Sequence, residues 1–287
     1  MSSPALSPIL RSLVLEQTGD SQWRAPSVPN EKRPVVMGGQ LLGQLILAAT
    51  AAQPGKQVRS LQTIFARAGS VTAPVELDVA TLHSGRTLGT LSVTARQGER
   101  LLAPGLALLD AGEPDVIRHQ PQMPDVPDAD AVPPTQMMVE EGTELRIVGD
   151  VDIRTTAVTG PAELLVWSRF DADSADQAVH QALLSWWTDP LLIGATMRPH
   201  AGFGQKLAHE TLSTGVLTHT ITFHEEVDAS QWHLFTNESV HAGHGRTYGT
   251  GNVFARDGRQ VASFAQESMI RWFPEGDTRR GTTAGAL

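Results

Sequence analysis

The sequence predicts an α+β protein made of two similar units, in each of which an antiparallel sheet wraps one helix. Three observations predict this fold class: an internal repeat, one strongly apolar helix in each half, and a proline-rich segment between the halves. The chain has 287 residues, of which 40% are hydrophobic and 18% charged, a balance that suffices for a sizeable core. At about 150 residues per domain, this length also favours two units.

The repeat becomes visible when residues 85–98 are placed over residues 245–258, an offset of 160 without gaps. Nine of the 14 positions are identical, where chance at ordinary composition gives about one. Both copies read as turn, strand, glycine turn and strand, which predicts one hairpin of an antiparallel sheet in each unit.

Each half also carries one apolar helix ahead of its strands. The first is predicted from about Gly38 to Ala52 and the second from about Ala175 to Thr188. In the second, apolar pairs at 178/179, 182/183 and 186/187 have the spacing of a buried helix face. The segment 174–177 resembles a capping box that would start this helix. A single helix and an apolar sheet bury each other best when the sheet wraps around the helix.

A proline-rich acidic segment separates the two halves. Residues 111–135 hold six of the 18 prolines and four aspartates. Because proline lacks a backbone donor and fixes φ, we expect an extended linker on the surface. The predicted organisation is an N-terminal unit over 1–110, a linker over 111–145, a C-terminal unit over 146–274 and a flexible tail over 275–287.

Composition excludes several classes of function. The chain has no cysteine, which removes thiol nucleophiles, disulfides and thiolate metal sites. The net charge of -9 argues against general binding to nucleic acid, because such proteins usually carry a basic surface. The longest apolar stretch, Leu41–Ala52, is interrupted by Gln44 and is shorter than the ~20 residues that span a bilayer. The N-terminus has no secretory pattern, so we expect a soluble, cytoplasmic protein without membrane insertion.

The repeat allows a search for polar residues that occur in only one half. Strand 261–272 corresponds to the strand that begins at Leu101. Alternation places six of its residues on one face: Ala262, Phe264, Gln266, Ser268, Ile270 and Trp272. Gln266 is an amide in this mostly apolar row. The offset of 160 gives Leu106 as its counterpart. A buried amide costs about 1–3 kcal/mol unless it is hydrogen-bonded, so Gln266 should have a specific partner. A structural amide bonded to the backbone is the alternative interpretation.

Asp189 is the second such residue. It lies three residues after Trp186, so it continues the apolar stripe of the second helix, and Pro190 is expected to end that helix. The negative end of the helix dipole, together with exclusion of water by Trp186 and Trp187, would raise the pKa of the carboxyl group and make it a better base. The alternative is an exposed aspartate at a helix end; the presence of the buried amide favours a functional role.

Several segments of the chain together match a known family. They are Met37–Gln44, Phe65–Gly69, Phe223-His224, Trp232–Ser239, Asp257-Gly258 and Val261–Arg271. In combination they resemble the type II acyl-CoA thioesterases, the TesB-like family, over about residues 30–110 and 160–272. This resemblance implies the double hotdog fold, in which two hotdog units are fused in one chain. It also implies hydrolysis of a fatty acyl-CoA to a free fatty acid and CoA, with no metal or other cofactor.

The resemblance assigns roles to particular residues. The family activates a water molecule with an Asp, a Gln and a Ser/Thr hydroxyl, and the first two positions fall on Asp189 and Gln266. The hydroxyl position falls on Val216, which departs from the pattern. If alternation is regular, Thr214 and Thr218 share the strand face of Val216, so a shift of two residues would let Thr218 take this role.

Substrate contacts are expected from two further groups of residues. The start of the first helix, at Gly38, Gly39 and Gln40, would hold the oxyanion with backbone N–H groups. Arg67 and Arg271 are candidates for contacting the CoA phosphates. By analogy we also expect a homo-oligomer.

Other functions remain as alternatives. An acyl-CoA-binding protein without turnover is suggested by Val216, and a hotdog hydratase would need a histidine close after Asp189. There is no Gly-x-Ser-x-Gly elbow of a serine hydrolase. His241 and His244 have no clear third ligand in the sequence, so no metal site is predicted.

Overall fold

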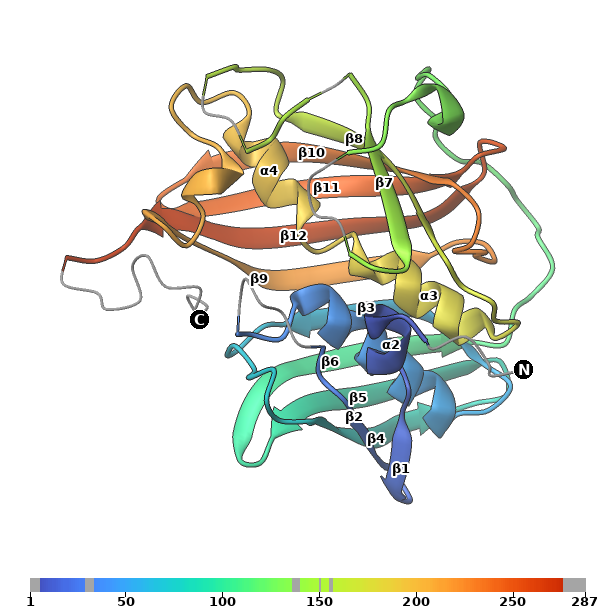
Figure 1. The fold of residues 1–287 in the computed structure, drawn as a ribbon. Coiled ribbons are helices and arrows are strands. Elements are labelled where there is room, and N and C mark those ends of the chain that lie inside the picture. The colour runs from blue at the N-terminus through green and yellow to red at the C-terminus, as the bar shows by residue number, and fades with distance from the viewer. Residues whose placement is uncertain (1–5, 29–33, 136–139, 150, 155–156, 276–287) are drawn as a thin grey trace, which may run out of the picture.

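The computed structural model describes residues 6–28, 34–135, 140–149, 151–154 and 157–275 (Figure 1). In these residues one antiparallel sheet of twelve strands runs through both halves in the order β1-β2-β4-β5-β6-β3-β9-β12-β11-β10-β8-β7. The strands of the first half are β1 (Glu16–Gly19), β2 (Gln22–Ala25), β3 (Gln57–Ile64), β4 (Val75–Ser84), β5 (Leu88–Gln97) and β6 (Arg100–Asp110). Those of the second half are β7 (Thr143–Ile147), β8 (Glu163–Phe170), β9 (Leu212–Phe223), β10 (His233–Gly243), β11 (Arg246–Ala255) and β12 (Gln260–Trp272).

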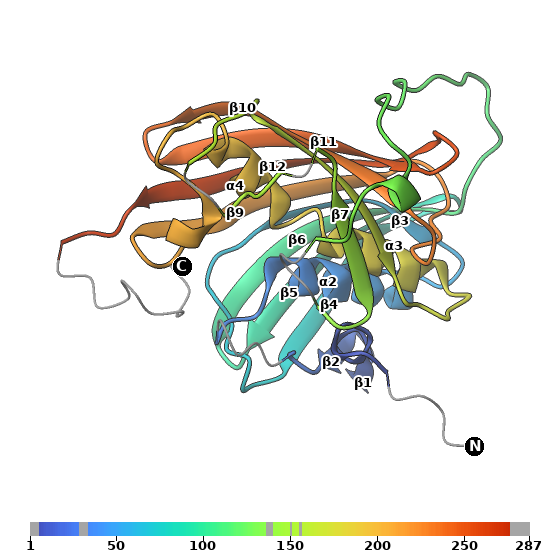
Figure 2. The same cartoon turned by 45° about the horizontal axis from the view of Figure 1, so that its top comes forward.

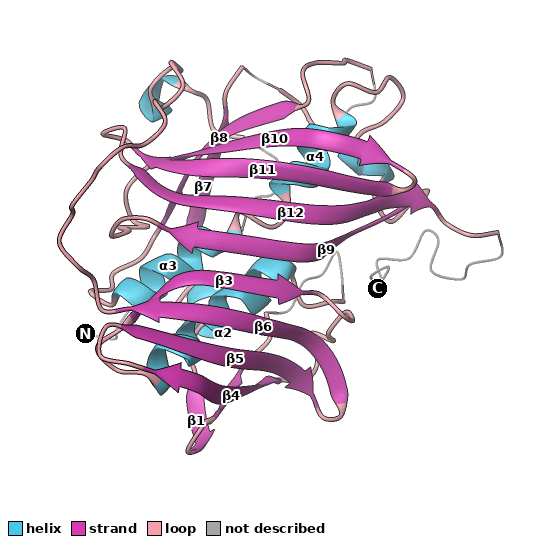
Figure 3. Ribbon diagram, turned by 180° about the vertical axis from the view of Figure 1, so that it is seen from behind, coloured by secondary structure: helices cyan, strands magenta, loops and turns pink. Residues whose placement is uncertain are grey.

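The helices lie on one side of this sheet, as the view from behind shows (Figure 3). They are α1 (Pro8–Ser12), α2 (Gly38–Ala52), α3 (Gln177–Trp186) and α4 (Leu191–Met197). Two short 3-10 turns, η1 (Ala129–Ala131) and η2 (Gln205–Leu207), lie outside these helices, and η1 belongs to the segment on the outer face of the sheet. The two halves meet where β3 pairs with β9, with Leu61 opposite Ile221 and both side chains fully buried. Two helix-wrapping sheets joined edge to edge form the double hotdog that the sequence predicted.

The first predicted helix is confirmed to the residue, whereas the second differs at both ends. Asp176, and not Ser174, caps α3: its side chain accepts a hydrogen bond of 2.9 Å from the Ala178 N–H. α3 ends at Trp186, before Pro190 as expected, but Pro190 does not end the helical region. It is the N-cap of α4, which begins at Leu191, because proline loses nothing at a position whose N–H has no partner within the helix. Residues 187–190 therefore form a short break between two helices.

Helices α2 and α3 lie side by side (Figure 2) and touch through their backbones. A Cβ atom at Gly39 would lie 2.4 Å from the carbonyl oxygen of Trp186, and one at Gly43 would lie 3.2 Å from that of Ala182. Glycine at these two positions of α2 removes the side chains that would hold the helices apart. This contact brings the start of α2 against the end of α3.

The predicted hairpins of the repeat are both present. Gly98 and Gly258 occupy equivalent turns and both have positive φ, 57° and 89°, which glycine adopts at no steric cost. Gly89 and Gly249 each lie where the strand approaches a helical segment: a Cβ atom there would lie 2.0 Å from Gln53 Oε1 and 2.7 Å from Leu192 Cδ2, respectively. The identities of the repeat thus have a structural basis.

The strand register corrects one comparison between the halves. Gly249 is opposite Gln266, and its equivalent Gly89 is opposite Leu109. The counterpart of Gln266 is therefore the buried Leu109, and Leu106 instead lies on the outer face with 52% of its surface exposed. The constant offset fails here because the first hairpin is longer than the second: Leu109 follows Gly89 by 20 residues, whereas Gln266 follows Gly249 by 17. The contrast of an amide with a leucine nevertheless holds.

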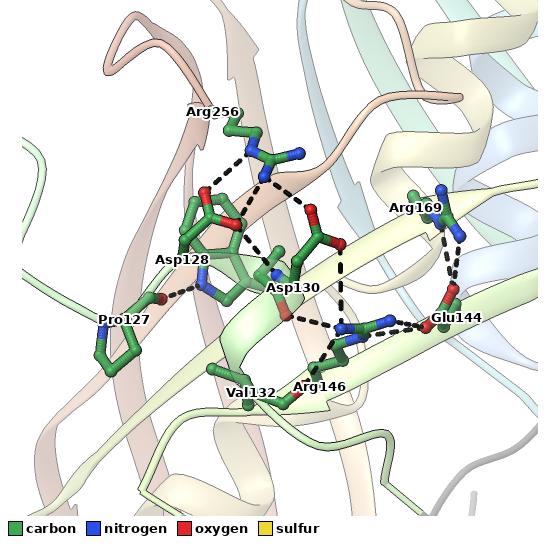
Figure 4. A network of polar contacts seen from close by, with 10 residues as sticks. Pro127, Asp128, Asp130, Val132, Glu144, Arg146, Arg169 and Arg256 are labelled. Carbon is green, nitrogen blue, oxygen red and sulfur yellow. Dashed lines mark hydrogen bonds and ion pairs between the residues drawn. The ribbon is translucent and has the colours of Figure 1, made fainter.

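The acidic segment between the halves is attached to the outer face of the sheet. Ala129 and Val132 are buried against Trp167, Trp232 and Phe254 in a second, smaller hydrophobic cluster. Polar contacts surround this cluster (Figure 4): Arg256 bonds both Asp128 and Asp130, and Arg146 donates to the carbonyl groups of Ala129 and Val132. The segment is thus docked by its acidic residues. The domain boundaries remain a prediction, and the predicted tail beyond residue 275 lies outside the described residues.

The backbone contact between α2 and α3 predicts a graded response to added methyl groups. Gly39→Ala should lower the free energy of unfolding by about 2–3 kcal/mol, because overpacking at 2.4 Å outweighs the gain of about 1 kcal/mol in helix propensity. Gly43→Ala, with more room, should cost less. Urea denaturation measures both. Equal stability of Gly39→Ala and the parent would contradict the contact.

Candidate active site

Asp189 lies in the break between α3 and α4, and only 6% of its surface is exposed. A Cβ atom at Gly38 would lie 2.3 Å from Asp189 Oδ1 and 2.8 Å from Cγ. The carboxyl group therefore rests directly on the first turn of α2, and only glycine at position 38 leaves room for it. The Met37 side chain makes no capping hydrogen bond at this helix start.

This position changes the electrostatic argument made from the sequence. Asp189 follows the end of α3, as expected, but it also lies against the positive N-terminal end of α2. Free N–H groups at a helix start attract a carboxylate. Two helix ends of opposite sign thus meet at this carboxyl group. The negative C-terminal end of α3 is therefore not the only helix end that acts on it.

Gln266 lies on the inner face of β12 with 1% of its surface exposed. The strand face predicted from the sequence is confirmed for Ala262, Phe264, Gln266 and Ser268, all of which are buried. It does not extend to Trp272, which is 62% exposed. The Gln266 amide has specific partners: Oε1 is 3.2 Å from His219 Nδ1, and Nε2 donates to Ser268 Oγ at 2.9 Å.

His219 links the amide to the helix break. Its Nε2 atom lies 3.0 Å from Thr188 Oγ1, and Thr188 immediately precedes Asp189. Burial lowers the pKa of His219 to about 4, so the ring is neutral near pH 7. This neutral ring ties β9 and β12 to the helix break.

The same place in the first half is apolar. There Leu109 pairs with Val58, whereas in the second half Gln266 pairs with His219. Since the two halves otherwise share their hairpin pattern, the polar pair is not needed to build the fold. The contrast between the halves favours a functional role for the polar pair Gln266 and His219.

The hydroxyl that the resemblance placed at Val216 is not supplied by Thr218. A β-bulge leaves Leu217 without a partner on β12, because Glu267 pairs with Thr218 and Ser268 pairs with Val216. The extra residue reverses the alternation, so Thr218 does not share the face of Val216. Thr218 lies opposite the exposed Ile64 on the outer face. The structure thus corrects the expectation of a common face.

The other predicted residues are placed as follows. Gly38 and Gly39 are at the start of α2 beside Asp189 and Trp186. The Gln40 side chain is buried and is engaged elsewhere, since its amide bonds the backbone of Pro26 and Val28.

The two candidate arginines are exposed at one end of the sheet. Thr63 and Gln266 both lie opposite His219, from its two sides. Arg67 comes four residues after Thr63, and Arg271 comes five residues after Gln266. Because β3 and β12 run in the same direction on either side of β9, both arginines lie beyond the same end of the polar pair.

In the described ranges no group of three or more metal-ligating side chains comes together. No helix of the described part of the chain is long and apolar enough to cross a membrane.

Comparison with known proteins gives matches along most of the chain. Residues 27–109 match the model of the acyl-CoA thioesterase N-terminal domain, and residues 119–270 match that of the C-terminal domain. Acyl-CoA thioesterase 2 of Haemophilus influenzae is 27% identical over 94% of this chain and 99% of its own length. Human acyl-coenzyme A thioesterase 8 is 25% identical over 84% of this chain and 82% of its own length. Among solved structures, acyl-CoA thioesterase II TesB2 from Mycobacterium marinum is 28% identical, covers 93% of this chain and 99% of its own, and has a TM-score of 0.78.

The neutral, buried His219 predicts a dependence of stability on pH. Its pKa is about 4 in the folded protein and about 6.5 in the unfolded chain. Between these values the unfolded state binds a proton that the folded state does not, so stability falls as the pH falls from 6.5 to 4. Each such histidine contributes a slope of about 1.4 kcal/mol per pH unit.

His219→Gln should therefore flatten the loss of stability between pH 6.5 and 5, as measured by urea denaturation at several pH values. His233 provides a matched comparison, because burial also lowers its pKa to about 4, so a second slope should remain in the variant. An unchanged slope would show that His219 accepts a proton in the folded state.

Proposed function

Because the chain belongs to the acyl-CoA thioesterase family, we propose that Asp189 and Gln266 activate the water that hydrolyses its acyl-CoA thioester. The observation that carries this proposal is the arrangement around the helix break. The Asp189 carboxyl group rests on the start of α2, and Gln266 is tied to the adjacent Thr188 through His219. A general base and an orienting amide are the groups that such a hydrolysis needs.

In the proposed mechanism Asp189 takes a proton from water as the water oxygen attacks the thioester carbonyl. The Gln266 amide orients this water, and N–H groups of the first turn of α2, at Gly38 and Gly39, hold the developing oxyanion. When the tetrahedral intermediate collapses, the carbon–sulfur bond breaks. The proton on Asp189 then passes to the leaving thiolate, which gives free acid and CoA and restores the carboxylate.

The alternative of an acyl-CoA-binding protein without turnover is not favoured. It was suggested by the absence of a hydroxyl at Val216, but the buried Asp189 and the polar pair of Gln266 and His219 are both present. A fatty acyl-CoA as the substrate, a cytoplasmic location and a homo-oligomer stay parts of the proposal. Light scattering on the purified protein tests the last of these.

Removal of either group should abolish hydrolysis while the fold is retained. Asp189→Asn should lower kcat by about 10²–10⁴-fold, the usual contribution of a general base, and Gln266→Ala by about 100-fold. Thiol release from a panel of acyl-CoA substrates measures both. Glu267→Gln is the matched control, because this exposed carboxylate follows Gln266 on the other face of β12. If Asp189→Asn kept the parent rate, Asp189 would not be the base.

The two exposed arginines should affect binding of CoA and not the chemical step. Arg67→Ala and Arg271→Ala should each raise KM for acyl-CoA severalfold, because each loses a charge-assisted contact to a phosphate, with kcat little changed. An acyl thioester of N-acetylcysteamine lacks the phosphates, so both variants should hydrolyse it with the kcat and KM of the parent. Arg24→Ala on β2 is the control with the same change of charge. An equal effect on both substrates would refute a phosphate contact.

A further inference from the structure

A buried serine lies next to the Gln266 amide and has no part in the mechanism so far. Ser268 is on β12, two residues after Gln266 and on the same inner face, and only 2% of its surface is exposed. Its Oγ accepts a hydrogen bond of 2.9 Å from Gln266 Nε2. Directly opposite on β9 is Val216, which has no polar group. At this level of the strand pair the hydroxyl group therefore comes from β12.

The chemistry of the neighbouring groups explains why a hydroxyl fits there. A neutral imidazole has one N–H donor and one acceptor nitrogen, so His219 can meet either end of the Gln266 amide, depending on its tautomer. A serine hydroxyl both donates and accepts. Ser268 can therefore pair with whichever end of the amide faces away from His219. The two partners hold the amide from both ends and fix the plane in which it meets a water molecule.

The first half has neither of these polar groups. Since Gln266 corresponds to Leu109 in the strand register, Ser268 corresponds to Ala111. A hotdog unit thus forms its sheet without the hydroxyl. Ser268 occurs in the half that also carries His219 and Gln266, which is expected if the three act as a set.

We propose that Ser268 is a positioning residue of the active site, whose hydroxyl group holds the Gln266 amide in the orientation needed to direct water. The role rests on the proposed function, because Ser268 acts through Gln266 and does not itself touch the reacting atoms. Val216 and Ser268, as cross-strand neighbours, are alternative places from which one hydroxyl group reaches the amide.

The test compares three single-site variants with the parent. Ser268→Ala should lower kcat about tenfold and change KM less than twofold, because a loosened amide disturbs the chemical step and not the binding of substrate. Ser268→Thr, which restores a hydroxyl, should stay within threefold of the parent kcat. Ser263→Ala is the matched control: it removes a partly buried serine of the same strand that bonds His224 Nε2, and should leave kcat unchanged. Thermal melts verify that each variant is folded.

A double-mutant cycle shows whether Ser268 works through the amide. In a Gln266→Ala background, adding Ser268→Ala should lower kcat by less than a further factor of two. The effects of two substitutions do not add when one residue acts through the other. In a Ser268→Ala background, Val216→Thr should recover at least part of the lost kcat from the opposite strand.

Several results would overturn the proposal. They are an unchanged kcat in folded Ser268→Ala, an equal loss with and without Gln266, or no recovery by Val216→Thr. These outcomes differ from failure of the proposed function, in which Asp189→Asn and Gln266→Ala would themselves keep the parent rate. If both of those variants lose activity and Ser268→Ala does not, only the role of Ser268 is refuted.

Discussion

The close approach of α2 to the end of α3 is the constraint on which the site depends. At Gly39 the α2 backbone touches the Trp186 carbonyl group, and at Gly38 it leaves room for the Asp189 carboxyl group. A side chain at either position would separate the two helices. Since each helix belongs to a different half, the proposed general base and the proposed oxyanion donors come together only because the halves pack this tightly.

Around this contact the protein holds a short chain of polar groups in an apolar interior. Four side chains form it, each at most 2% exposed: Thr188, His219, Gln266 and Ser268. Each is hydrogen-bonded to the next in this order. Buried polar groups are costly unless they are satisfied, and satisfied networks are rigid. This series of hydrogen bonds couples strands β9 and β12 to the helix break, and its rigidity suits the role that we propose for the Gln266 amide.

The sequence was sufficient for the fold class, the first helix and the burial of Asp189 and Gln266, because these depend on apolar periodicity and on the repeat. The sequence was misleading wherever the chain departs from the regular alternation of a strand or from the constant offset of the repeat. The bulge at Leu217 reverses the faces of β9, so Thr218 points outward. The first hairpin is longer than the second, and this moves the counterpart of Gln266 from Leu106 to Leu109. Pro190 follows the end of the second helix, as expected, but it also serves as the N-cap of α4, which the sequence did not predict. Ser268 was visible on the strand face, but its bond to Gln266 requires coordinates.

The docked linker has a consequence for how such a protein can diversify. In a dimer of two identical hotdog subunits, every substitution appears in both subunits. The association of the subunits also depends on protein concentration. Here a chain segment joins the halves; Arg256 bonds its residues Asp128 and Asp130, and Arg146 donates to the carbonyl group of its Ala129. The second half therefore meets the first at a fixed, high effective concentration. Each half can then accumulate substitutions of its own, so that one keeps the apolar pair Val58 and Leu109 while the other carries the polar one.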